Sequence, residues 1–276
     1  MIETPLFVPH DGAHLAALLA RPERKARSLV LILPGVCGLR GGRAKIWTRT
    51  ARELAERGIA SVRIDYEGTG DSTGVCSTSF SAPAVREADT IVNTLMPQLG
   101  VDSFAIIGNC IGARVGLLLA AERSSCIGLA CSLHQGPRPL LEKQGVGPSR
   151  LAMRRIGIAF PRLLGLARRS RFFDFAHHHL HFIPEVPRVL QSTPTLFLLV
   201  GSETTRSRME RALARVQPKR NAPPSLSRLI GGPETTNPEI ADVEIASLVE
   251  WLDTTLPKNG SEAQVRELRD ARARGV

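Results

Sequence analysis

The stretch Gly108-Asn109-Cys110-Ile111-Gly112 decides the fold that we expect for this chain. An apolar run at residues 104–107 precedes it, and a second apolar run at residues 115–121 follows it. The first run has the length of a buried strand and the second begins a helix, so the glycine-flanked stretch between them is predicted to be a sharp turn. A cysteine at the middle of such a turn is either a small buried residue or a reactive thiol. The rest of the chain has to decide between the two.

On the N-terminal side of this turn, predicted strands and helices alternate. Asp11-Gly12 separates two short apolar segments, which favours a β-hairpin. Two apolar runs of strand length come next, and each ends in a loop that contains glycine: residues 28–33 before Pro34-Gly35-Val36-Cys37-Gly38, and residues 59–64 before residues 65–74. Helical patterns follow these loops, at about residues 43–57 and 83–99. Continuous apolar strands that alternate with helices are typical of a parallel sheet.

On the C-terminal side the alternation is interrupted once. A strand is predicted at residues 126–133, with His134 at its carboxyl end, and residues 135–191 are basic, helical in pattern and punctuated by prolines. We interpret residues 135–191 as a helical cap inserted into a core made of residues 1–134 and 192–257. The core resumes with strands at 195–200 and 225–230 and helices at about 204–216 and 239–256. Residues 258–276 are a charged tail, either a loose helix or disordered.

Composition limits the class of protein. A chain of 276 residues with 43% hydrophobic content can bury a full core as one domain with an insertion. No apolar run reaches the about 18 residues of a membrane span, and the N-terminus lacks the pattern of a signal peptide, so we expect a cytoplasmic protein that does not bind membranes. The five cysteines are odd in number and form no Cys-x-x-Cys pair, which predicts reduced thiols rather than a disulfide framework or a zinc site.

The formal net charge of +10 raises the question of an anionic partner. The arginines are scattered and aromatic residues make up only 4% of the chain, so we expect no nucleic-acid binding. An acidic small molecule or an acidic carrier protein fits the charge better, and a solvated basic surface is the alternative. Composition leaves homodimer formation open.

The order of these motifs resembles the α/β-hydrolase superfamily over about residues 5–256. The resemblance implies an α/β-hydrolase fold: a mostly parallel, doubly wound sheet with an inserted helical cap. It also implies that the turn at Cys110 is the nucleophile elbow, which presents a reactive side chain between two close-packed glycines. With cysteine as its central residue, this elbow resembles the elbows of dienelactone hydrolases, of polyhydroxyalkanoate synthases and of the hydrolase-like proteins of exosortase-linked loci. The resemblance further implies an oxyanion hole formed by the backbone N–H groups of Val36 and Ile111.

The chain departs from the family pattern at two catalytic positions. The family acid corresponds to Thr204, so we expect its neighbour Glu203 to substitute. The family histidine corresponds to Thr235, and no histidine occurs after His181. His134 is the candidate replacement base, because the carboxyl ends of strands line the ligand crevice of open α/β sheets. The alternative is that His134 caps its strand or contacts the cap.

A histidine cluster at His177-His178-His179-Leu180-His181 falls in the predicted cap. His177 and His181 would share one helix face, as metal-binding histidines do. No carboxylate or cysteine of matching spacing accompanies them, so we expect a cap surface or a substrate contact. We predict neither a metal nor any other cofactor.

A cysteine nucleophile without the usual base still has chemistry available. Thiols are a few per cent thiolate near neutral pH, and a helix N-terminus favours the anion, so a thioester can be attacked unaided. Hydrolysis of the resulting acyl group needs a base to deprotonate water, which makes transfer to a better nucleophile relatively easier. The first hypothesis is a cysteine-dependent acyl-transfer enzyme, similar to thioesterases and acyltransferases, acting on a small activated acyl substrate such as a thioester of coenzyme A or of a carrier protein.

Two other hypotheses belong to different classes. One is a lyase that eliminates a group such as acetate in natural-product tailoring, using the oxyanion hole without an acyl-enzyme. The other is a non-catalytic binding protein with a decayed site, because fold alone does not establish activity.

Overall fold

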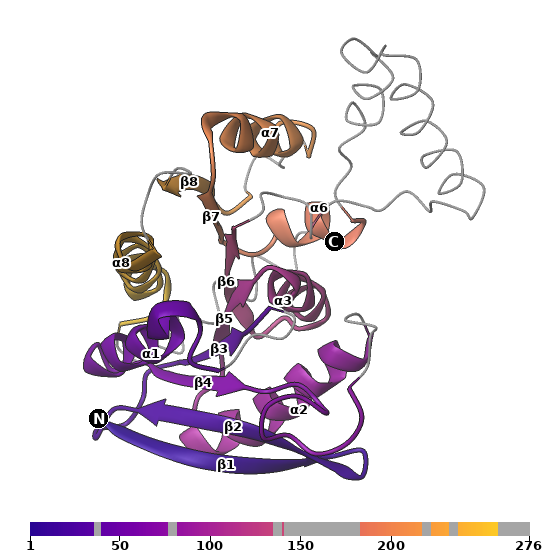
Figure 1. Cartoon of the computed structure of the whole chain (residues 1–276), viewed down its shortest axis with the longest axis vertical. Helices are drawn as coiled ribbons and strands as arrows, with labels where there is room; N and C mark the ends of the chain where they lie inside the picture. The colour runs from indigo at the N-terminus through magenta and orange to yellow at the C-terminus, as the bar shows by residue number, and fades with distance from the viewer. Residues whose placement is uncertain are drawn as a thin grey trace, which may run out of the picture.

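The computed structural model describes residues 1–35, 40–76, 82–134, 140, 183–216, 222–231 and 237–258. In this part of the chain, one eight-stranded sheet has the order β1-β2-β4-β3-β5-β6-β7-β8 (Figure 1). The strands are β1 (Ile2–His10), β2 (Ala13–Arg21), β3 (Leu29–Leu33), β4 (Ala60–Ile64), β5 (Phe104–Asn109), β6 (Cys126–Leu133), β7 (Thr195–Val200) and β8 (Ser225–Gly231). The β1–β2 and β2–β4 pairs are antiparallel and the other pairs are parallel. The predicted mostly parallel sheet is confirmed.

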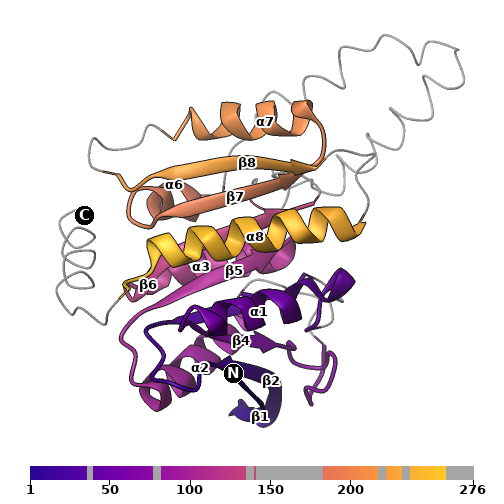
Figure 2. The same ribbon diagram turned by 90° about the vertical axis from the view of Figure 1, so that its left-hand side faces the viewer.

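Helices cover both faces of the sheet, and each face has its own buried cluster. On one face lie α1 (Ile46–Glu56) and α8 (Asn237–Thr255), which Figure 2 shows in front of the strands. The other face is covered by α2 (Ala82–Leu99), α3 (Ile111–Glu122), α6 (Glu185–Leu190) and α7 (Glu203–Leu213). A parallel sheet buries both of its faces in this way, which explains why its strands are continuously apolar in sequence.

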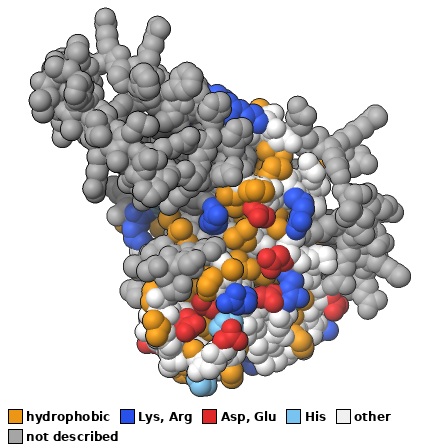
Figure 3. Space-filling view, turned by 90° about the vertical axis from the view of Figure 1, so that its right-hand side faces the viewer, with side chains coloured by type: hydrophobic (Ala, Val, Ile, Leu, Met, Phe, Trp, Pro, Cys, Tyr) orange, Lys and Arg blue, Asp and Glu red, His pale blue; other side chains and the backbone are white. Residues whose placement is uncertain are grey.

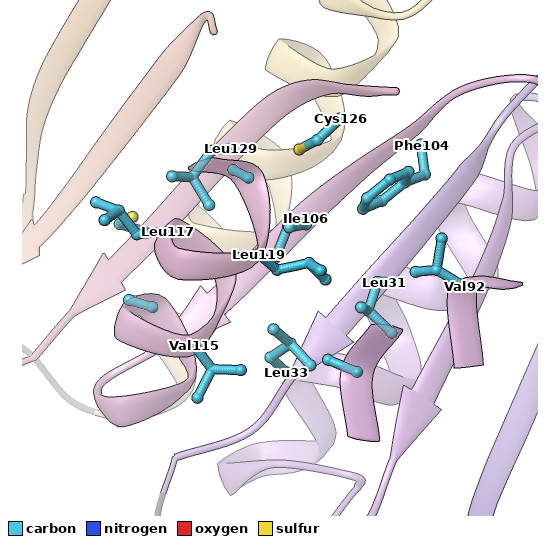
Figure 4. Packing of buried hydrophobic residues seen from close by; sticks show 14 of the residues in the cluster. Leu31, Leu33, Val92, Phe104, Ile106, Val115, Leu117, Leu119, Cys126 and Leu129 are labelled. Carbon is cyan, nitrogen blue, oxygen red and sulfur yellow. The ribbon is translucent and has the colours of Figure 1, made fainter. Parts of the chain in front are cut away.

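Helix α3 packs tightly on the middle of the sheet and so fixes the turn before it. Figure 4 shows Val115 and Leu119 of α3 beside Leu33 and Ile106 of the strands below. Gly116 lets the helix approach closely, because a Cβ there would lie 2.7 Å from Cγ2 of Ile106. Val115, Leu119, Leu33 and Ile106 are all fully buried, so α3 and the two strands form a rigid base for the turn at Cys110.

The predicted helix at residues 43–57 begins differently in the structure. A 3-10 turn, η1 (Arg43–Lys45), comes first, and Ala44 and Lys45 have left-handed φ angles of 50° and 55°. Helix α1 therefore starts only at Ile46. Burial of Trp47 accounts for the kink, because this ring packs so closely on Gly42 that a Cβ there would lie 2.5 Å from Cδ1 of Trp47.

The end of α8 is tied to the N-terminal part of the chain by Arg27. Its guanidinium donates hydrogen bonds to the backbone oxygens of Leu256, at 2.8 Å, and Pro257, at 2.7 Å. It also pairs with Asp253 at 2.5 Å. These carbonyls lie at the C-terminal end of a helix, where a cation is favourable. The last described helix is thus fixed to a residue near the start of the fold.

The predicted cap falls mostly on residues outside the described part of the chain, as does the tail from residue 259 onward. The described end of the cap segment contains α6, which packs on α3, and Val186, Val189 and Leu190 join the same buried cluster as α3. The extent of an inserted cap therefore stays a prediction.

Glu87 of α2 supplies a test of stability against pH. Its side chain is buried, and it accepts a hydrogen bond from the backbone N–H of Glu67 at 2.8 Å. Burial raises the pKa of Glu87, so the folded protein holds this proton more tightly than the unfolded chain does. The unfolding free energy of the wild type should therefore fall, relative to Glu87→Gln, as pH rises above the ordinary range of glutamate. Urea unfolding of both proteins at several pH values measures this difference.

The exposed Glu56→Gln is the matched control, and a difference for Glu87→Gln that does not grow with pH would contradict the prediction.

Candidate active site

The strand, turn and helix predicted around Cys110 are present. Strand β5 ends at Asn109, α3 begins at Ile111, and Cys110 is the N-cap residue with φ 51° and ψ −112°. A non-glycine residue with positive φ is strained, and such strain persists only where the surrounding structure holds it. This backbone conformation belongs to a sharp strand-to-helix turn that presents its central side chain. The Cys110 side chain is half-buried.

The two flanking glycines are required by backbone contacts. A Cβ at Gly108 would lie 2.4 Å from Cα of Ala113, and a Cβ at Gly112 would lie 2.2 Å from the carbonyl oxygen of Leu33. Both neighbours are main-chain atoms, which cannot move aside as a flexible side chain can. The glycines of the sequence pattern therefore let α3 approach both its own strand and β3.

The loop after β3 runs beside the turn. A Cβ built on Gly35 would lie 3.0 Å from Oδ1 of Asn109 and 3.3 Å from Cβ of Cys110. Val36 and Cys37 come next in this loop and lie outside the described residues. Ile111 is the first residue of α3, where backbone N–H groups lack acceptors within the helix and attract anions. The assignment of Val36 and Ile111 to an oxyanion hole stays a prediction.

His134 follows β6, the strand next to β5, and both of its ring nitrogens have partners. Nε2 lies 3.1 Å from Oε2 of Glu244, and Nδ1 lies 3.0 Å from a guanidinium nitrogen of Arg43. A guanidinium can only donate, so Nδ1 must accept, and the ring proton belongs on Nε2, which donates to Glu244. Arg43 comes from η1 and Glu244 from α8, so three separate segments meet at this histidine.

A serine connects this group to the turn. The Ser132 hydroxyl donates to Oε1 of Glu244 at 2.5 Å, and the side-chain amide of Asn109 lies 3.5 Å from the Ser132 hydroxyl oxygen. The backbone N–H of Cys110 donates to the carbonyl of Ser132 at 3.1 Å. Hydrogen bonds therefore run from the residue before Cys110 to the carboxylate that holds His134. We refer to Asn109, Ser132, His134, Glu244 and Arg43 as the Glu244 network.

Within the described ranges, the Cys110 thiol is not paired with a base. Among the described residues, Cys110 has no side-chain hydrogen bond. His134 lies at the end of the neighbouring strand, but its accepting nitrogen is occupied by Arg43. The structure thus places Cys110 and His134 at the same edge of the sheet without joining them, and the role of His134 as the base stays a prediction.

Glu203 is not brought to Cys110 by any contact in the described part of the chain. Its side chain is 63% exposed in the first turn of α7, and its carboxylate pairs with Arg206 one turn later. Its role as the catalytic acid stays a prediction that no contact among the described residues supports. Thr235 and the histidine cluster at His177–His181 lie outside the described residues. Within the described ranges, no group of three His, Cys, Asp or Glu side chains is arranged to hold a metal ion.

Charges of both signs are mixed on the described surface that Figure 3 shows. Figure 3 shows acidic and basic side chains interspersed on the visible described face, without a large patch of one sign. Such mixing is typical of a solvated surface. Of the helices that the structure describes, none combines the length and apolarity needed to span a bilayer.

Comparison with known proteins gives the family and the fold. The model of the alpha/beta hydrolase family matches residues 30–271. An esterase from an Arctic intertidal metagenomic library has 17% identity and a TM-score of 0.57, with 92% of this chain and 93% of that chain covered. A dienelactone hydrolase from Anabaena variabilis also has 17% identity and a TM-score of 0.57, over 93% and 99% of the chains. An alpha-beta serine hydrolase homologue from Coxiella burnetii has 14% identity and a TM-score of 0.55, over 92% and 97%. No curated protein sequence matches significantly.

Proposed function

The chain belongs to the alpha/beta hydrolase family, and from this premise we propose that it is a cysteine-dependent acyl-transfer enzyme. The substrate class is an activated acyl group, carried as a thioester on coenzyme A or on an acidic carrier protein. One observation carries the proposal: Cys110 occupies the strained tip of the β5–α3 turn, with φ 51°. A strained residue that only its surroundings hold in place is a recurrent feature of active sites.

The first step forms an acyl-enzyme. The Cys110 thiolate attacks the carbonyl carbon, and the carbonyl electron pair moves onto oxygen, where the N–H groups of Ile111 and Val36 stabilise it. Collapse of this intermediate breaks the bond to the substrate sulfur, which leaves as a thiolate. In the second step an acceptor attacks the acyl carbon, its proton passes to a base, and Cys110 leaves as a thiolate. His134 is our candidate for that base.

Transfer is favoured over hydrolysis by the state of His134. Water needs a general base before it can attack, whereas a thiolate acceptor does not. Because Arg43 already donates to Nδ1 of His134, this imidazole is not a vacant base for an incoming water in the free enzyme. We therefore expect the acyl-enzyme to survive long enough to reach an acceptor.

Intact-protein mass spectrometry tests the proposal. The protein is incubated with acetyl, butyryl and succinyl thioesters of N-acetylcysteamine, and we expect a mass increase equal to one acyl group. The adduct should map to Cys110 and disappear in Cys110→Ala. Cys76→Ala is the matched control, because Cys76 is an exposed thiol on a different loop. Failure to detect an adduct, together with full activity of Cys110→Ala, would overturn the proposal.

A further inference from the structure

Glu244 presents a carboxylate in an environment that usually excludes charge. Its side chain has no exposed surface, and it sits on α8 among fully or almost fully buried residues such as Ala241, Ile245 and Leu248. A buried carboxylate is costly unless hydrogen bonds and a countercharge compensate it. Each of its oxygens has one donor, the Ser132 hydroxyl on Oε1 and the His134 imidazole on Oε2. The packing is thus built around this one acidic group.

Apart from a 3.5 Å contact of the Asn109 amide with the Ser132 carbonyl oxygen, the side-chain hydrogen bonds described for the Glu244 network point toward that carboxylate. One branch runs from the Arg43 guanidinium to Nδ1 of His134 and from Nε2 to Glu244. The other runs from the Asn109 amide to the Ser132 hydroxyl and on to Glu244. Arginine and asparagine supply donors at the outer ends, and the carboxylate supplies only acceptors at the centre. This polarity leaves a single arrangement of protons on His134.

We propose that Glu244 is the positioning residue of the site: it fixes His134 in the tautomer whose Nδ1 receives the proton of the acyl acceptor. Glu244 touches neither substrate nor thiol and acts through the imidazole alone. The inference rests on the proposed function, because it concerns the second half of the same reaction. It adds a carboxylate from the middle of α8, in place of Glu203, as the partner of the base.

Protons and bonds balance in the transfer of the acyl group from Cys110 to an acceptor. An amine acceptor attacks the acyl carbon, a C–N bond forms, and the C–S bond to Cys110 breaks. The amine proton goes to Nδ1 of His134, and the imidazolium that results keeps its Nε2 proton on Glu244, whose negative charge stabilises it. Return of one proton from the imidazolium to the Cys110 thiolate restores the starting state.

Arg43 controls whether Nδ1 is available. Its side chain is exposed on η1, and its hydrogen bond occupies the lone pair that has to accept the proton. A solvent-exposed arginine contact is weak, so an anionic group of the bound substrate or carrier can draw Arg43 away from the ring. Arg43→Ala should then speed the decay of an acyl-enzyme that carries a neutral butyryl group, at least threefold. Slower decay in this variant would overturn the assignment of Nδ1 as the accepting atom.

The central experiment compares two acceptors on preloaded butyryl-enzyme. With glycinamide, whose proton has to be removed, decay should slow by about a hundredfold in His134→Gln and by about tenfold or more in Glu244→Gln. Glu244→Asp should recover part of the rate. With 2-mercaptoethanol at about pH 9, where thiolate is abundant, the acyl-enzyme of every variant should decay within about twofold of the wild-type rate.

If the role of Glu244 were merely structural, its loss would slow decay with both acceptors alike. That result would overturn the inference, and so would unchanged rates with glycinamide. Glu250→Gln, an exposed acid on the same helix, is the matched control.

The imidazole nitrogens can be observed without catalysis. In 15N-histidine spectra, the His134 signals are identified by their loss in His134→Gln, and the wild type should show a protonated Nε2 and an unprotonated Nδ1. In the Arg43→Ala background, where Glu244 is the remaining partner of the ring in the described part of the chain, adding Glu244→Gln should mix the two tautomers. An Nδ1–H tautomer in the wild type would overturn the inference even if no variant at Glu244 folds. Absence of any acyl-enzyme would instead overturn the proposed function, while normal loading with unaltered decay would overturn this inference alone.

Discussion

Gly112→Ala is expected to lose about 3 kcal/mol or more of unfolding free energy, a large fraction of the stability of an ordinary domain. Alanine is the better helix former by about 1 kcal/mol, so propensity alone predicts the opposite sign. The contact decides, because the new Cβ would lie 2.2 Å from the Leu33 carbonyl oxygen and 2.6 Å from that of Pro34. Relief requires α3 to move away from β3, which disrupts the buried contacts of both elements.

Urea unfolding measures the effect, and Gly128→Ala is the control. A Cβ at Gly128, in β6, would meet only side chains at 3.4–3.5 Å, which is ordinary van der Waals contact. That variant should stay within about 1 kcal/mol of the wild type. Equal stabilities of the two alanine variants would mean that α3 is not held against β3 as described.

Cys110→Ser should slow acyl-enzyme formation by about a hundredfold or more, the contribution that a general base makes to a hydroxyl nucleophile. The substitution replaces only sulfur by oxygen, so unfolding free energy should be nearly unchanged. To measure the rate, the protein is incubated with butyryl N-acetylcysteamine, the reaction is quenched at set times, and the acylated fraction is determined by intact-protein mass spectrometry. A serine elbow works in hydrolases that place a free histidine beside it, whereas here Nδ1 of His134 is held by Arg43.

Two outcomes of this experiment would redirect the assignment. Turnover by Cys110→Ser without any covalent adduct would favour a lyase that uses the site but forms no acyl-enzyme. Ordinary reactivity of the Cys110 thiol toward iodoacetamide across pH, combined with no turnover of any thioester, would favour a non-catalytic binding protein.

Local signals in the sequence predict most of the fold. The predicted strands at residues 126–133 and 195–200 coincide with β6 and β7, because these runs are mostly apolar and bounded by polar or turn residues. The turn at Cys110 is predictable because two close backbone contacts require its flanking glycines. Gly108 contacts the start of α3, and Gly112 contacts the end of β3. The late start of α1 could not be predicted from the sequence, because it depends on the packing of Trp47 against Gly42 and not on hydrophobic periodicity.

The site could be predicted only where its residues follow strands. Cys110 and His134 stand at the carboxyl ends of adjacent strands, which sheet topology brings together. Arg43 and Glu244 lie 91 and 110 residues from His134 and belong to no motif. One signal pointed to Glu244: it is an acidic residue on the apolar stripe that α8 buries. The prediction of Glu203 rests on its place beside Thr204 in the family pattern, and in the structure Glu203 pairs with Arg206 at the surface.

The position of Glu244 on α8 also sets the order in which a growing chain can complete this site. At typical synthesis rates, the 110 residues between His134 and Glu244 take about 5 to 20 s to add. During that interval Cys110 and His134 are already synthesised, while the apolar sheet face that α8 covers in the folded protein is still exposed. Final closure also requires Leu256 and Pro257 to reach Arg27, which was made more than 200 residues earlier. The thiol of Cys110 therefore acquires a fully assembled site only after α8 has been made, long after Cys110 and His134 themselves.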